Sequence, residues 1–99
     1  MSARLLDQEK KALSHALEGV EGDIFIYGSR SDPGKKGGDI DVLIMSRVSS
    51  PYRLAQDIAV RFQMECDEKI DVMVVNPDHI PEEQRLFLDC VRRKAVPLK

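Results

Sequence analysis

Three aspartates set among β-branched residues are the side chains of this sequence best suited to chemistry. Asp39 and Asp41 stand two residues apart at the start of one apolar run, and Asp71 lies near the start of another. Because side chains alternate across a strand, Asp39 and Asp41 are expected on one face, about 7 Å apart. Like charges this close repel each other unless a cation lies between them. Carboxylate oxygens suit Mg²⁺, so Asp39, Asp41 and Asp71 are predicted to bind magnesium.

A Gly-Ser pair at the end of the preceding apolar run is a candidate phosphate-binding turn. Gly28 allows a positive φ and a close approach of the backbone to a ligand. Ser29 offers a hydroxyl and a backbone N–H to phosphate oxygens. Arg30 is placed to contact outer phosphates, whereas Lys35 and Lys36 are typical of a solvated loop. The spacing of a P-loop, G-x-x-x-x-G-K-S/T, is not met when it is counted from Gly28.

Hydrophobic periodicity predicts a small α/β (α+β) fold with the order α-β-β-α-β-α. The helices are expected at residues 3–18, 51 to about 67 and 81 to about 94, and the strands at residues 23–27, 39–45 and 69–75. Ser50 followed by Pro51 is typical of a helix start. With no linker or repeat between these elements, residues 1–99 are predicted to form a single domain.

The Gly-Ser turn and the aspartates can meet only if the strands are arranged in one way. Gly28 follows the end of the first strand whereas Asp39 begins the second, so these strands must run antiparallel. Asp71 lies near the start of the third strand, which must then run parallel to the second, with the middle helix as the crossover. The prediction is a mixed three-stranded sheet with packed helices and an active edge where the three aspartates meet.

Composition restricts the class of protein. The 99 residues include 32% charged side chains and carry a formal net charge of −2, which argues against a general nucleic-acid binder. No stretch approaches the roughly 20 apolar residues that span a bilayer, and the N-terminus lacks the apolar run of a secretory signal. Cys66 and Cys90 fall on the expected apolar faces of two helices, so they are predicted to be reduced core thiols of a cytoplasmic protein.

These residues together resemble the DNA polymerase β-like nucleotidyltransferase superfamily, and in particular its minimal nucleotidyltransferases. The signature of that family is a Gly-Ser pair, a spacer of about ten residues and an Asp-x-Asp between apolar residues. It stands here as Gly28-Ser29, nine intervening residues and Asp39-Ile40-Asp41. Asp71 matches the third carboxylate of the family on a later strand. The spacer departs from the pattern, because many relatives carry a second arginine shortly after the one that Arg30 matches.

The resemblance implies a magnesium-dependent transfer of AMP from ATP to a hydroxyl group. Asp39 and Asp41 would hold two Mg²⁺ ions that straddle the triphosphate, and Asp71 would ligate one ion and help activate the attacking hydroxyl. Pyrophosphate would leave. Minimal members of this size resemble the antitoxins of prokaryotic two-gene toxin–antitoxin pairs, whose partner is a helical HEPN-domain ribonuclease. The implied acceptor is a tyrosine of that toxin.

Three other interpretations of the same residues are open. The aspartates could be no more than a strand cap and a surface pair, although three carboxylates with a Gly-Ser pair in this order argue against it. The chain could inhibit its partner by binding alone, without catalysis. It could also be the catalytic subunit of an enzyme that modifies a small molecule such as an aminoglycoside, with the acceptor site supplied by a separate helical subunit.

Overall fold

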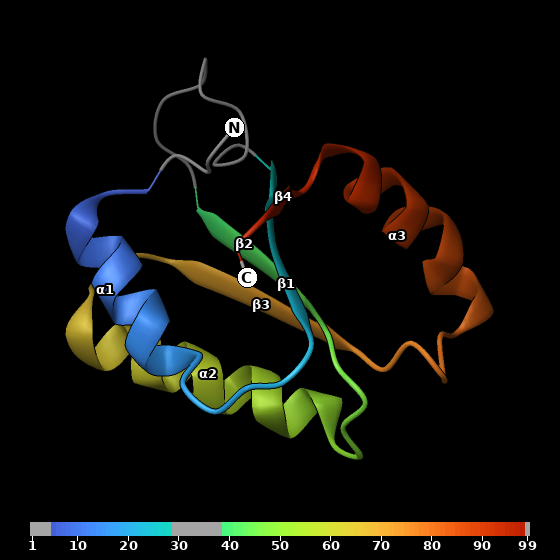
Figure 1. Cartoon of the computed structure of the whole chain (residues 1–99), viewed down its shortest axis with the longest axis horizontal. Coiled ribbons are helices and arrows are strands. Elements are labelled where there is room, and N and C mark those ends of the chain that lie inside the picture. The colour runs from blue at the N-terminus through green and yellow to red at the C-terminus, as the bar shows by residue number, and fades with distance from the viewer. Residues whose placement is uncertain (1–4, 29–38, 99) are drawn as a thin grey trace.

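Three helices and a four-stranded mixed sheet make up the fold in the computed structural model, which describes residues 5–28 and 39–98 (Figure 1). In chain order the elements are α1 (Asp7–Ala16), β1 (Asp23–Tyr27), β2 (Ile40–Met45), α2 (Pro51–Glu65), β3 (Ile70–Val75), α3 (Glu82–Lys94) and β4 (Val96–Pro97). The predicted order of helices and strands is confirmed as far as α3. The first helix begins later than predicted, because the Leu6 N–H donates a hydrogen bond to Glu9 Oε1 (2.8 Å) and starts the helix at Asp7.

The sheet has the strand order β3-β2-β1-β4. β1 and β2 run antiparallel and β2 and β3 run parallel, with α2 as the crossover, as predicted. The prediction of three strands is wrong, because β4 adds antiparallel to the free edge of β1. The Leu98 N–H continues this pairing with a 2.8 Å hydrogen bond to the Ile24 carbonyl. A two-residue strand that contains a proline gives no periodicity, and proline is tolerated only at such an edge.

One face of the sheet is covered by α1 and α2 (Figure 1). The even-numbered residues of β1 and β2 point to this face and are fully buried, as strand alternation requires, whereas those of β3 are partly buried. They pack against the apolar stripes of the two helices. The largest buried side chains of this cluster are Leu13, Ile24, Ile26, Ile40, Val42, Ile44, Ile58 and Phe62. This cluster fixes the orientation of β2 and β3, and so fixes where their odd-numbered aspartates point.

The opposite face is covered by α3 alone (Figure 1). Its small core joins Leu43 and Val75 of the sheet to Leu88 and Val91 of α3. The helical spacing of the apolar residues predicts a buried face made of Leu86, Phe87, Cys90 and Val91. Only Val91 of these is buried, since Leu86 is 76% exposed and Phe87 is 46% exposed. The apolar residues of α3 are spread over about half of its circumference, so their periodicity alone does not identify the buried stripe.

The contrast between two leucines of α3 gives a first test of the fold. Leu88→Ala should lower the free energy of unfolding by about 2–5 kcal/mol, because it leaves a cavity between α3 and the sheet. Leu86→Ala, the same change two residues earlier on an exposed position, should stay within about 0.5 kcal/mol of the parent. Urea unfolding of the two variants measures both values. Equal losses would contradict this placement of α3.

Both cysteines of the chain lie in the described part, and neither is in a disulfide. Cys66 follows α2 and is buried, as predicted, whereas Cys90 is exposed on α3, so the prediction of a second core thiol is wrong. Among the described residues, no helix combines the length and the apolar character that crossing a membrane would require.

Candidate active site

The aspartates of β2 and β3 lie side by side. Asp41 and Asp71 are register partners in the parallel pair, and neighbouring strands lie about 4.8 Å apart. Asp39 directly precedes β2 and is exposed. The buried neighbours Ile40 and Val42 point to the opposite face, so the aspartates face the side of the sheet that carries α3. The predicted parallel pairing therefore brings these two carboxylates together.

Tyr27 extends this pair into a row across three strands. It is the register partner of Asp41 in the antiparallel pair, and cross-strand partners share one face. The order across the sheet is therefore Tyr27, Asp41, Asp71. The Tyr27 ring meets Phe87 of α3 edge to face, with 6.4 Å between ring centroids and 84° between ring planes. Sequence reasoning missed Tyr27, although its place one residue before Gly28 at the end of an apolar run was a usable signal.

The Gly28 backbone lies against the Asp41 carboxylate. Its φ of +73° falls in the left-handed region, which favours glycine. A Cβ atom at this position would collide with Asp41 Oδ2. Gly28 therefore lies beside Asp41, as the predicted antiparallel pairing of β1 and β2 requires. Ser29 and Arg30, predicted to bind phosphate, lie outside the described residues, as do Lys35 and Lys36.

The electrostatics of the row follow from its burial and its like charges. Partial burial raises the pKa of the Asp41 carboxyl, and the charges of Asp71 and then Asp39 raise it further. Burial, followed by the charges of Asp41 and Asp71, raises the pKa of Tyr27 to about 12. At neutral pH the Tyr27 phenol therefore keeps its proton and can donate a hydrogen bond beside carboxylates that repel one another. A cation bound here would relieve that repulsion.

The contribution of Asp41 to the raised pKa of Tyr27 can be tested by spectroscopy. The chain has two tyrosines, so a Tyr27→Phe variant identifies by difference which phenol ionises near pH 12. Asp41→Asn removes the second cause of the shift and should lower the pKa of Tyr27. Ultraviolet titration at 295 nm measures both, with circular dichroism as the control for unfolding at high pH. An unchanged Tyr27 pKa in Asp41→Asn would contradict the row.

The carboxylates do not form a ready metal-binding group. Within residues 5–28 and 39–98, no three or more His, Cys, Asp or Glu side chains already have an arrangement that could hold a metal ion. The structure thus pairs Asp41 with Asp71 and places Asp39 within electrostatic range of Asp41. Asp39 was predicted to converge with Asp41 and Asp71. Its charge acts on the Asp41 carboxyl, but the three side chains do not form a three-ligand cluster in the described part of the chain.

A groove of about 1010 Å³ runs from this row along the outer side of β3. Tyr27, Asp71 and Phe87 line one end of it, and Arg47 and His79 line the other. A second hollow of about 1020 Å³ is lined by residues such as Glu18, Ser46, Arg61 and Arg92 and includes none of the three aspartates. Of these two cavities in the described part of the chain, the groove beside β3 is the one that reaches the row, through Tyr27 and Asp71.

A scan against protein-family models and a search of curated proteins gave no match to this chain.

Proposed function

We propose that this chain is a magnesium-dependent nucleotidyltransferase that moves AMP from ATP to a hydroxyl group. The acceptor in this proposal is a tyrosine of a HEPN-domain toxin, which the chain silences as the antitoxin of a cytoplasmic toxin–antitoxin pair. One observation carries the proposal. Asp41 and Asp71 are paired in register beside the positive-φ turn at Gly28, which is the juxtaposition that the family signature requires.

The donor set fits magnesium in its chemistry. Asp39, Asp41 and Asp71 offer only oxygen ligands, which magnesium prefers. Burial and the charges of the two other aspartates raise the pKa of Asp41, and bound Mg²⁺ would offset this effect by favouring the ionised carboxylates. Bound Mg²⁺ supplies charge stabilisation for the entering and leaving oxygens of a phosphoryl displacement.

The groups of the chain itself have separate tasks in this proposal. The Gly28 backbone, with no side chain in the way of Asp41, lets the triphosphate approach the carboxylates closely. Asp71, the exposed member of the pair, accepts the proton of the attacking hydroxyl. Tyr27 stays protonated at neutral pH and can donate a hydrogen bond to an oxygen beside Asp41. Ser29 and Arg30 are the proposed partners of the outer phosphates.

The test is a transfer reaction with defined components. The purified chain is incubated with Mg²⁺–ATP and a HEPN-domain protein from the same genome, and the partner is analysed by intact-mass and peptide mass spectrometry. The expected product carries one added AMP on a tyrosine, and omission of Mg²⁺ abolishes the addition. A tight complex without modification would instead support inhibition by binding alone. AMP found only on a small-molecule hydroxyl would support the third interpretation.

A further inference from the structure

We propose that the open edge of β3 is the docking site for an extended segment of the acceptor protein, which binds as an added strand and places its hydroxyl at Asp71. The reaction of the docked segment rests on the proposed function, whereas the docking is inferred from the geometry of the groove alone. β3 is the outermost strand of the sheet. Figure 1 shows β3 in orange at the edge of the sheet, with α2 and α3 on either side of its C-terminal end.

The backbone of β3 presents a row of hydrogen-bonding groups to the groove. The Ile40 N–H bonds to the Lys69 carbonyl (3.1 Å), and the Ser46 N–H bonds to the Val75 carbonyl (2.9 Å). Between these two bonds the regular parallel ladder uses the odd-numbered residues of β3. The N–H and C=O groups of Ile70, Val72 and Val74 therefore point to the open edge, where no described strand pairs with them.

The groove has the shape expected of a strand site. Six consecutive residues of the chain, 71–76, line its floor, which shows that the cavity follows the strand edge itself. The first turns of α2 and α3 form its walls, with Tyr52 on one side and Phe87 on the other. Both rings are exposed, at 87% and 46%, and so are available to an incoming side chain. A single added strand lies about 4.8 Å from the strand it pairs with, so it fits a groove that follows the edge of β3.

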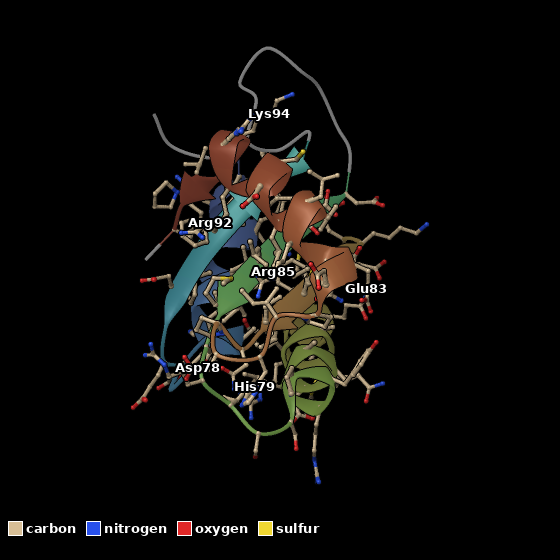
Figure 2. The ribbon with its side chains drawn as sticks, turned by 90° about the vertical axis from the view of Figure 1, so that its right-hand side faces the viewer. Asp78, His79, Glu83, Arg85, Arg92 and Lys94 are labelled. Carbon is tan, nitrogen blue, oxygen red and sulfur yellow. The ribbon has the colours of Figure 1, made fainter. Side chains whose placement is uncertain are left out.

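The charged residues at the two ends of the groove indicate which peptide sequence would bind there. The Asp71 end is acidic and lies beside the candidate active site, whereas the other end carries Arg47 and His79. Figure 2 shows His79 and its neighbour Asp78 in the loop before α3. Arg47 uses its Nε for the bond to Asp78 (3.0 Å), so its terminal N–H groups can face the groove. The favoured segment is apolar, with a hydroxyl residue at one end and a carboxylate about five residues away.

Val74→Pro tests the docking edge without touching the row. Proline removes the outward N–H of Val74 while the ladder to β2, which uses Met73 and Val75, is kept. Val74→Thr is the matched control, because it retains the N–H and the β-branched shape. A phage library of random peptides about seven residues long is selected on the immobilised parent chain, and each binder is then measured on both variants by fluorescence polarisation.

The expected binders are β-branched and carry Tyr, Ser or Thr near one end. Val74→Pro should weaken them at least about ten-fold and Val74→Thr less than three-fold. If Val74→Pro does not fold, N-methylation of each binder residue in turn replaces it, and every second methyl group should abolish binding to the parent. The inference is overturned if no binder is selected, if neither change reduces binding, or if sedimentation shows the edge occupied by a second copy.

Transfer of labelled AMP to the bound peptides separates this inference from the proposed function. Peptides that dock at the edge but receive no AMP would leave the docking site standing and count against the reaction. AMP transfer to an acceptor that is unaffected by Val74→Pro would leave the reaction standing and overturn the docking site.

Discussion

Asp41→Asn should abolish AMP transfer while the chain remains folded. The carboxylate of Asp41 stands at the centre of the row, between Tyr27 and Asp71 and against the Gly28 backbone. Loss of one essential group of a catalytic unit typically lowers turnover by about 10⁴-fold or more. The amide keeps the size of the side chain, so the packing around it is retained. Single-turnover transfer of labelled AMP measures the loss.

Asp57→Asn is the matched control for this variant. It makes the same chemical change on an exposed position of α2, and it should leave transfer within about two-fold of the parent. The melting temperature with and without Mg²⁺–ATP gives a second readout. A ligand at 100 times its Kd stabilises a fold by about 2.7 kcal/mol, and this gain should be seen for the parent and Asp57→Asn and lost for Asp41→Asn. An intact gain in Asp41→Asn would exclude Asp41 from the binding site.

The pH dependence of stability has a definite sign for Asp41. Its pKa is raised in the folded chain by burial, then by Asp71 and Asp39, so the folded state holds this proton to higher pH than the unfolded state does. The resulting stabilisation is present below the unfolded pKa of about 4 and is lost as the pH rises through the folded pKa. Without metal, the melting temperature of the parent should therefore fall more than that of Asp41→Asn over this rise in pH.

The positions of Gly28, Asp41 and Asp71 in the sheet could be predicted from the sequence because strand alternation and strand direction leave few choices. Ile40 and Val42 had to be buried, which sent Asp41 to the other face. The need to place Gly28 beside Asp41 then required an antiparallel β1–β2 pair, and Asp71 required a parallel β3. The structure contains both pairings. The alternation is a local rule, whereas the strand directions followed from the requirement that the Gly28 turn and the aspartates share one edge of the sheet.

The missed features depend on tertiary contacts that have no local signature. β4 exists because the chain after α3 returns to the free edge of β1, and nothing in two residues specifies that return. The buried stripe of α3 is chosen by the sheet beneath it, which selects Leu88 over Leu86. The role of Tyr27 required the register of β1 against β2, which the strand boundaries alone do not determine.

Gly28→Ala should disable nucleotide binding, because the new Cβ collides with the Asp41 carboxylate. Gly19 provides the control that separates this collision from the cost of the positive φ. Gly28 and Gly19 have nearly the same positive φ, +73° and +80°, so alanine at either position should cost about 1–2 kcal/mol of stability. A Cβ at Gly19 meets nothing within 4 Å, whereas a Cβ at Gly28 runs into Asp41 Oδ2. The excess loss in Gly28→Ala therefore measures the contact with the carboxylate.

The expected result is that Gly19→Ala keeps its affinity for Mg²⁺–ATP and Gly28→Ala loses it. The new methyl group must displace the Asp41 carboxylate from its position beside Asp71, because a Cβ at Gly28 meets the atoms of that side chain. Isothermal titration with a non-hydrolysable ATP analogue measures affinity, and urea unfolding measures stability. A double-mutant cycle with Asp41→Ala should show a coupling of about 0.5–3 kcal/mol. Equal effects of the two glycine substitutions, or additive losses in that cycle, would show that the Gly28 turn and the carboxylate act independently.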